Sequence, residues 1–351
     1  MTGTRALALL MLLGGCVRGA DDPEGSQPAG SQIDSSQEEL SHTRRRDDDT
    51  TDLFRLLGRN AIWTQLSAVE MQGWTTFHTQ GLVKIGDAFF VSSVEVLEPT
   101  VPNGTQTDAL YDFSIDRSVG VGRGWLSKFS ADGHLLGQVE LTHGSIYHPG
   151  GIDFDGESLW VPVAEYRPNS HSEIYRVDPD TLEAELAFRV DDHIGGIVHN
   201  RHGGTLNGVS WGSRRLYTFE PHGRGHGHGE PRDPESSWTP NGDSTIDYQD
   251  CHYHGVEYML CGGVASYATP SGPIAFGGLD LVDLRSARAV QQVPVNQFID
   301  EGSGPNPGLA LAHNAFWAEP LDDRSLRIYF MTETDNQAAL LVYRATPWVN
   351  R

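Results

Sequence analysis

The chain has 351 residues, 38% of them hydrophobic, and a formal net charge of −22 at pH 7. This composition is that of a globular protein long enough to bury one large core or two smaller ones. So large an excess of acidic residues repels phosphate backbones and anionic lipid headgroups, so nucleic acid is not an expected partner. The charge alone identifies no substrate.

The first sixteen residues have the features of an export signal. Arg5 precedes a short apolar run, residues 6–13, which is too brief to span a bilayer as a helix. The run closes on Leu13-Gly14-Gly15-Cys16, which resembles the lipobox of bacterial lipoproteins. The resemblance implies that Cys16 receives the lipid, and Val17 after it resembles the outer-membrane sorting pattern. We therefore expect a protein anchored to the cell envelope through lipid, at the outer membrane or facing the periplasm.

Residues 17–51 form a polar segment rich in Ser, Gln, Gly, Asp and Glu, with almost no apolar periodicity. Such a segment has too little apolar surface to form a core. The prediction is a disordered tether between the lipid anchor and a folded domain over residues 60–351.

Lipidation of Cys16 would leave two cysteines, Cys251 and Cys261. An even pair in an oxidising compartment predicts a disulfide, and two buried free thiols are the alternative. Their separation of ten residues differs from the C-x-x-C spacing that zinc sites favour, so a cysteine metal site is not expected.

Beyond residue 60 the sequence has the pattern of an all-β protein. Short alternating apolar runs are separated by Gly, Pro, Asn and Asp. Residues 125–141 and 172–190 share a strand–turn–strand pattern typical of the outer hairpin of a propeller blade. Five blade starts predict a five-bladed β-propeller, with six blades as the alternative. Residues 61–71 precede the first start, and we expect them to join the last blade and close the ring, which removes an exposed edge.

Four blade starts carry a histidine in the frame H-x-x-G followed by an aliphatic residue. The innermost strands of a propeller line its channel, so equivalent positions should converge on one axis. Several neutral imidazoles at one point suit one divalent transition metal, Fe, Cu, Zn or Mn, better than calcium. The alternative is that the rings hydrogen-bond channel waters and backbone. The predicted ligands are His78, His148, His193 and His252, with His254 as the alternative to His252.

Three glutamates occupy matching places after these histidines. Glu95 and Glu165 each lie 17 residues beyond a repeated histidine, and Glu333 holds the corresponding place in the last blade. Metal-bound histidines usually donate their second N–H to a carboxylate, which predicts these glutamates as the outer shell. The set resembles the carotenoid cleavage oxygenases, whose propeller holds iron with four axial histidines backed by glutamates. This chain is shorter and has fewer expected blades, so the resemblance implies geometry rather than substrate.

From about residue 60 onward the chain resembles uncharacterised bacterial propeller domains of unknown function, and distantly the strictosidine-synthase and gluconolactonase type of propeller. Propellers host unrelated functions, so this implies a fold more than an activity. The leading hypothesis is an exported metal-dependent enzyme, oxidative if the metal is iron or copper, that acts as a monomer on a small-molecule substrate. The alternatives are a lactonase or hydrolase-type propeller, and a non-catalytic surface propeller that binds a protein or glycan.

Overall fold

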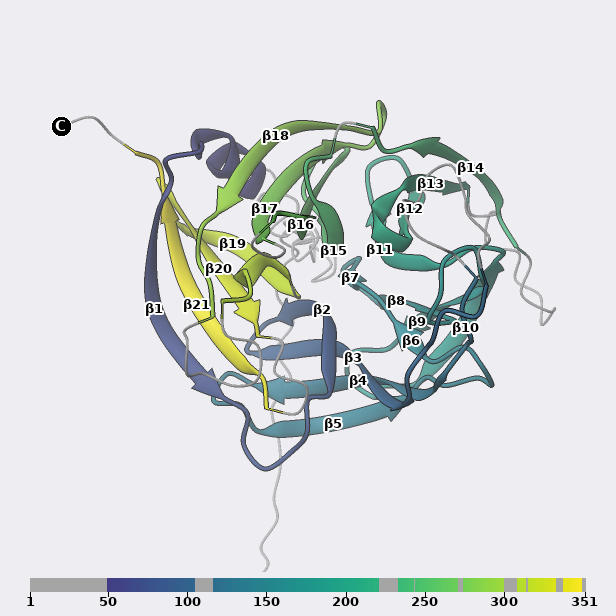
Figure 1. The fold of residues 1–351 in the computed structure, drawn as a ribbon. Coiled ribbons are helices and arrows are strands. Elements are labelled where there is room, and N and C mark those ends of the chain that lie inside the picture. Colours follow the sequence, from purple (N-terminus) through teal and green to yellow (C-terminus); the bar gives the residue numbers. More distant parts are fainter. Residues whose placement is uncertain are drawn as a thin grey trace, which may run out of the picture.

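The computed structural model is a five-bladed β-propeller (Figure 1). It describes residues 49–104, 116–220, 233–242, 244–270, 274–299, 308–313, 315–332 and 337–348. From the axis outward, blade one consists of β2 (His78–Ile85), β3 (Ala88–Glu98), β4 (Val121–Ser130) and β5 (Leu135–Glu140). Blade two consists of β6 (His148–Pro149) together with β7 (Asp153–Phe154), then β8 (Leu159–Ala164), β9 (Ser172–Val177) and β10 (Ala184–Val190). Blade three consists of β11 (Ile194–Asn200), β12 (Thr205–Ser210), β13 (Arg215–Glu220) and β14 (Glu235–Pro240).

The fourth and fifth blades complete the ring. They comprise β15 (Asp247–Tyr253), β16 (Tyr258–Tyr267), β17 (Ile274–Asp283) and β18 (Arg288–Val295); and β19 (Phe316–Asp322), β20 (Ser325–Met331), β21 (Ala339–Thr346) and β1 (Ile62–Glu70). The outermost strand of the last blade is therefore the first strand of the chain, and β1 pairs antiparallel with β21. The predicted five blades and their closure by an N-terminal strand are confirmed, and the six-bladed alternative is wrong.

The hydrophobic core lies in layers between neighbouring blades. Between blades five and one, for example, Leu82 and Phe129 belong to the same buried cluster as Met331 and Leu340. Each such side chain contributes about 1.5–3 kcal/mol when it leaves water. Inner strands are covered on both faces, whereas outer strands such as β5 alternate exposed and half-buried residues.

A short helix over residues 49–56 precedes β1 and packs against blades four and five. Phe54 and Leu57 are buried in the same cluster as the strands of those blades, and the Gln291 side chain donates a hydrogen bond to the Leu57 carbonyl at 2.7 Å. The folded region therefore includes residues that precede the boundary predicted at residue 60.

The rest of the predicted signal peptide and tether, residues 1–48 with Cys16, lies outside the described residues. Within the part of the chain that the structure describes, no helix has the length and apolarity needed to cross a membrane.

The predicted disulfide between Cys251 and Cys261 is confirmed. The two cysteines stand directly opposite each other on the antiparallel strands β15 and β16. The bond therefore ties the inner strand of blade four to its neighbour.

Candidate functional site

The inner strands share one irregularity that sets how close they come to the axis. The pairing register shifts between Thr79 and Gly81 in β2 and between Ile194 and Gly196 in β11, as expected for a β-bulge. The glycine after each bulge allows backbones to touch: a Cβ placed on Gly81 would lie 2.6 Å from the Ile152 nitrogen. The H-x-x-G frame thus marks the place where neighbouring inner strands meet.

The bulge in blade four corrects the predicted frame there. Its register shift lies between Tyr248 and Asp250, and a Cβ on Gly151 would lie 2.9 Å from the Asp250 Cα. Asp250 therefore occupies the level of the repeated glycines, and Asp247 occupies the level of the histidines. His252 lies five residues farther along β15, roughly 15 Å in an extended strand. The structure does not bring His252 together with the other three histidines.

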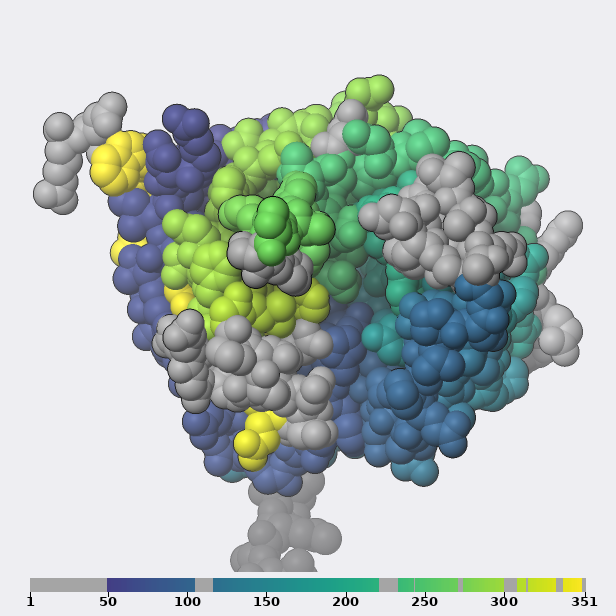
Figure 2. Space-filling view, viewed as in Figure 1, coloured from purple at the N-terminus to yellow at the C-terminus, as the bar shows by residue number. Residues whose placement is uncertain are grey.

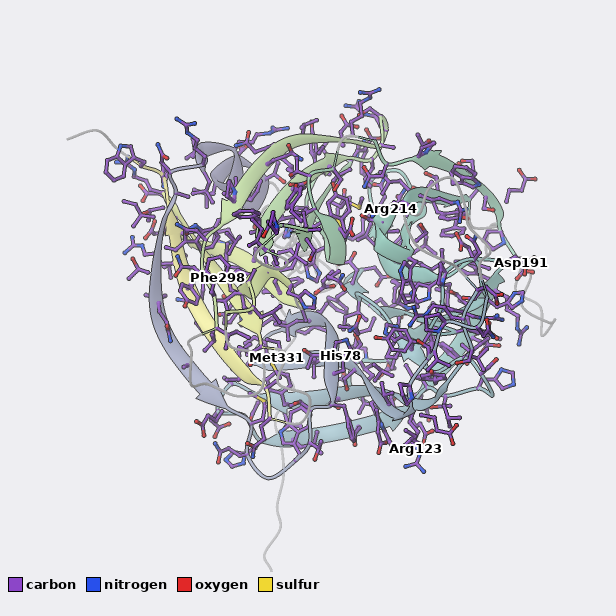
Figure 3. The ribbon with its side chains drawn as sticks, in the orientation of Figure 1. His78, Arg123, Asp191, Arg214, Phe298 and Met331 are labelled. Atoms are coloured by element: carbon purple, nitrogen blue, oxygen red, sulfur yellow. A yellow bond between two sulfur atoms is a disulfide. The ribbon has the colours of Figure 1, made fainter. Side chains whose placement is uncertain are left out.

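His78, His148 and His193 begin or immediately precede the inner strands of three successive blades, so they share one end of the channel. His78 lies near the centre of the ring, whereas Arg123 and Asp191 lie at its rim (Figure 3). The rings of His148 and His193 are 5.6 Å apart, centroid to centroid. We call these three histidines the mouth cluster.

The two buried rings of the mouth cluster are neutral at pH 7. Burial, followed by the proximity of His193 and His78, holds the pKa of His148 well below its usual value. Burial also lowers the pKa of His193. His193 Nδ1 donates a hydrogen bond to the backbone carbonyl of Glu165 at 2.8 Å, so its Nε2 carries the lone pair. His148 Nδ1 is buried and has no hydrogen-bond partner among the described residues.

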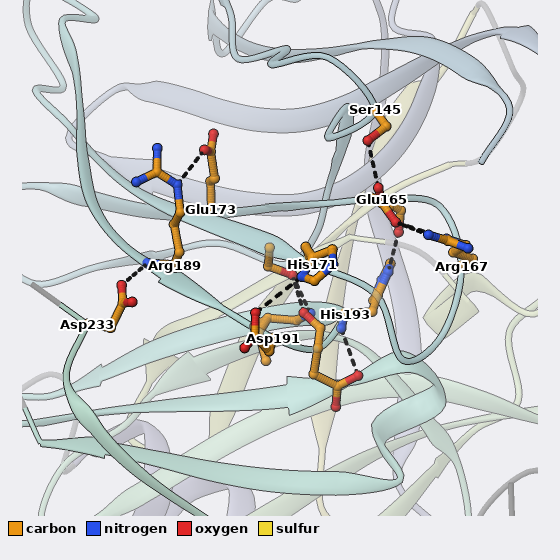
Figure 4. Close-up of polar contacts among 12 residues, drawn as sticks. Ser145, Glu165, Arg167, His171, Glu173, Arg189, Asp191, His193 and Asp233 are labelled. Carbon is orange, nitrogen blue, oxygen red and sulfur yellow. Dashed lines mark hydrogen bonds and ion pairs between the residues drawn. The ribbon is translucent and has the colours of Figure 1, made fainter. Parts of the chain in front are cut away.

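The predicted outer-shell glutamates bind arginine and tryptophan side chains. Glu95 accepts a hydrogen bond from Trp125 Nε1 at 3.3 Å and lies 3.7 Å from Arg123. Glu165 accepts from Ser145 at 2.6 Å and from Arg167 at 2.7 Å (Figure 4).

The backbone carbonyl of Glu165, rather than its carboxylate, accepts the hydrogen bond from His193 in the mouth cluster. Glu333 lies outside the described residues. In the described ranges, no three His, Cys, Asp or Glu side chains are already placed to bind one metal ion.

Asp250 lies near the axis, and its side chain forms hydrogen bonds to the backbone of three other blades. Its carboxylate accepts backbone N–H bonds from Leu82 at 2.9 Å, from Ile152 at 3.2 Å and from Phe316 at 3.2 Å. These donors belong to blades one, two and five, whereas Asp250 belongs to blade four. A single fully buried carboxylate therefore satisfies donors from three blades, which sequence reasoning had not identified.

His252 lies beside Asp250 and shares its burial. Its Nε2 donates to the Phe316 carbonyl at 2.7 Å and lies 3.3 Å from the Asp250 carboxylate. Its Nδ1 lies 3.8 Å from Asp153. Burial disfavours the charged ring, but Asp250 and Asp153 outweigh this and raise the pKa of His252 to about 10. We call Asp250, His252 and Asp153 the axial cluster. Carboxylates inside otherwise apolar inner strands were the available sequence signal.

A pocket of about 510 Å³ opens beside the mouth cluster. The strands next to the inner ones, β3, β8 and β12, run antiparallel to them and end on this face. Figure 2 shows the face, which is hollowed near its centre beside the blue segment that follows β3. The described lining residues come from the C-terminal end of β3 and from the segments after the three strands: Val96, Pro99, Thr100, Arg117, Tyr166 and Trp211.

Two pocket residues also contact the mouth cluster. Tyr166 stacks on His148 with ring centroids 4.0 Å apart, and Trp211 meets His193 edge-on at 4.8 Å. The two aromatic rings lie 5.7 Å from each other. Pocket and histidines therefore form one continuous site, and its aromatic walls were not predicted from the sequence.

A sequence model described as a family of unknown function, DUF6454, matches residues 46–347. No curated protein matches the chain. Solved structures with similar folds include the β-propeller domain of the Trilobed protease from Pyrococcus furiosus, at 11% identity and a TM-score of 0.30, covering 74% of this chain and 65% of that one. Another is the tail fiber of Staphylococcus aureus phage P68, at 9% identity and a TM-score of 0.41, covering 85% and 56%. The match thus spans less than two thirds of each of those chains.

Proposed function

Since the chain belongs to the DUF6454 family, for which no function is known, we propose from the site alone that this propeller binds a small molecule at its channel mouth and acts on it through the mouth cluster. The observation that carries the proposal is that Tyr166 and Trp211 line the pocket and also contact His148 and His193. A bound ligand would therefore lie one aromatic ring away from neutral, buried imidazoles. Pockets with apolar walls and a few polar groups are the usual small-molecule sites of proteins.

We propose that the mouth cluster uses a divalent transition metal, Fe, Cu, Zn or Mn. Neutral imidazole is the form that binds these ions, and the lowered pKa of His148 and His193 favours it. Two imidazoles on one tetrahedral ion have centroids about 5 Å apart, close to the 5.6 Å between these rings. The bond from His193 Nδ1 to a carbonyl leaves Nε2 for the metal, an arrangement common at metal sites.

Rotation of His78 toward the other two rings would complete a three-histidine site with open positions. When bound, such a metal would polarise a substrate or activate water or oxygen. His252 is not part of this proposal because its Nε2 already donates to the Phe316 carbonyl.

Elemental analysis of protein purified from its native compartment tests the metal. We expect about one transition metal per chain, lost in His148→Ala and in His193→Ala, because each removes one of three ligands. His134→Ala is the matched control, since His134 is exposed and pairs with Asp132. Metal-free wild-type protein would contradict the proposal that the protein binds a metal. Undiminished metal in His148→Ala would contradict the assignment of the metal to the mouth cluster.

A non-catalytic propeller that binds a protein or glycan is the alternative outcome. It predicts metal-free protein whose small-molecule pocket can be blocked without any loss of partner binding. A lactonase or other hydrolase predicts ester or lactone turnover that His148→Ala abolishes.

We also propose that Cys16 anchors the protein to the cell envelope. The Cys251–Cys261 disulfide supports this because such bonds persist in oxidising compartments. Detergent-phase partitioning of the full-length protein should be lost in Cys16→Ser. Unchanged partitioning would contradict the anchor.

A further inference from the structure

We infer that the ligand of the mouth pocket is a small carboxylate with a flat one- or two-ring body, and that Arg117 binds its carboxylate. This inference rests on the proposed small-molecule function and specifies its ligand class. The carboxylate need not contact a metal, so the inference can be tested in metal-free protein.

The charge of the lining points to an anion. The chain as a whole carries −22, yet the described residues that line the pocket include no carboxylate, and Arg117 is the charged residue among them. A cation inside a partly enclosed pocket attracts an anion more strongly than the same cation on an open surface. The described lining of the pocket is therefore cationic, in contrast to the acidic chain as a whole.

Arg117 is oriented for this role by one neighbouring residue. Its Nε and Nη2 donate to Thr100 Oγ1 at 3.3 and 3.0 Å, and Nη2 also reaches the Thr100 carbonyl at 3.4 Å. Among the described residues, Arg117 makes no ion pair, and its Nη1 makes no hydrogen bond. The planar end of a guanidinium fits a carboxylate, whereas phosphate sites usually add further cations or backbone N–H groups. One arginine therefore favours a carboxylate.

The walls indicate the shape of the rest of the ligand. Tyr166 and Trp211 meet at an interplanar angle of 41°, and Val96 and Pro99 add apolar surface. Flat rings pack well on such aromatic surfaces. A pocket of about 510 Å³ accepts a body of one or two rings rather than a long chain.

The segment that carries Arg117 is held in place by the side chain of Tyr147. Tyr147, the residue before His148, donates its hydroxyl to the Val119 carbonyl at 2.7 Å. Gly122 lies so close to the same ring that a Cβ there would be 2.5 Å from it. This packing fixes the arginine relative to the histidines, so the site is largely formed before the ligand arrives.

Calorimetric titration of two matched pairs of probes tests the inference. The pairs are indole-3-acetate with indole-3-acetamide, and 1-naphthoate with 1-naphthamide. Each is titrated into EDTA-treated full-length protein and into metal-loaded protein. At least one acid should bind about tenfold more tightly than its amide in the metal-free protein, because only the acid pairs with Arg117.

Three variants separate the contributions. Arg117→Gln should reduce the affinity for the acid to that of the amide, and Trp211→Leu should weaken acid and amide equally. Arg123→Gln is the matched control, because Arg123 is exposed and pairs with Glu95 outside the pocket. Circular dichroism checks that each variant is folded.

The outcomes distinguish the two proposals. Amides that bind as tightly as acids, or an Arg117→Gln variant with undiminished preference for acids, would overturn the carboxylate inference and leave the pocket intact. No binding by any probe overturns the inference too, and the proposed function then stands on the metal analysis alone. Phenyl phosphate binding where the acids fail would replace the carboxylate with a phosphate.

Discussion

The two ends of the inner strands carry the same kinds of residue in opposite electrostatic states. At the mouth, His148 and His193 are buried and neutral, and they adjoin a pocket. At the axial cluster, His252 is buried and charged, and it lies between two carboxylates. The difference teaches that burial of an imidazole does not by itself indicate its role. The residues around the ring decide whether its nitrogen atoms remain available to a ligand or are used in hydrogen bonds and ion pairs that stabilise the fold.

The axial cluster holds the blades together because its acceptors are saturated by three blades at once. In the mouth cluster, His148 Nδ1 is buried without a hydrogen-bond partner among the described residues, which costs stability and suits binding. Removing groups at each end should therefore have unequal effects.

The largest effect is expected for Asp250→Ala. It removes the acceptor for three buried N–H groups and the partner of the His252 cation. We expect a loss of about 4–5 kcal/mol in the free energy of unfolding, or failure to fold, measured by urea denaturation. Asp180→Ala, at an exposed aspartate, is the control. A loss below about 1 kcal/mol would show that Asp250 does not hold the blades together.

Asp250→Asn keeps the shape of the side chain and tests its charge. The pKa of His252 is raised to about 10, so its stabilisation is complete below the unfolded value of about 6.5 and is lost as pH rises toward 10. Between about pH 6.5 and pH 10, the free energy of unfolding of the wild type should fall by several kcal/mol, and that of the variant should fall much less. If the free energy of unfolding fell equally with pH in the two proteins, the raised pKa of His252 would not depend on the charge of Asp250.

The disulfide should rank next, since it fixes the strand that carries the axial cluster. Replacing both Cys251 and Cys261 with Ser should lower the free energy of unfolding by about 3 kcal/mol. Reductant should destabilise the wild type to the same extent and leave the double variant unchanged. A reductant effect on the variant would point to another cause.

Asp280 provides a contrast with Asp250, because this buried carboxylate has fewer donors. It accepts from Tyr248 at 3.1 Å and from Gln292 at 3.1 Å, and burial raises the pKa of Asp280 to about 6. The folded state therefore holds this proton more tightly, and stability is lost as pH rises from about 4 through 6.

Asp280→Asn should thus raise the free energy of unfolding by about 2 kcal/mol at pH 7.5 and leave it unchanged near pH 4. Thermal unfolding at the two pH values measures this difference. Destabilisation at both values would indicate that the ionised carboxylate is needed by the fold.

The smallest effect is expected at the mouth. His148→Phe keeps an aromatic ring on Tyr166 and removes the buried Nδ1, so stability at pH 7.5 should change by less than about 1 kcal/mol. The lowered pKa of His148 means that wild-type stability falls as pH drops below about 6.5, because the unfolded chain takes up the proton first. Relative to the wild type, the free energy of unfolding of the variant should therefore be about 1–2 kcal/mol higher at pH 5 than at pH 7.5. A variant as acid-sensitive as the wild type would show that His148 is not the group responsible.

Much of the fold could be predicted because blade strands repeat and are patterned locally. The alternation of apolar residues indicated the blades, the position of residues 61–71 indicated ring closure, and an even pair of cysteines indicated the disulfide. The site was predicted less well. The H-x-x-G frame identified three histidines at one level, but its fourth match, at His252, was a coincidence of spacing that the bulge in β15 reveals.

The sequence by itself determined that this chain forms an all-β ring of five blades, closed by its own first strand, because periodicity and turns are properties of adjacent residues. Only the tertiary structure decided which level of the channel each inner residue occupies, because one bulged residue shifts every later position on its strand. It also decided the partners of the buried charges. Asp250 meets Leu82, Ile152 and Phe316 across long stretches of chain, and no local pattern records such a meeting.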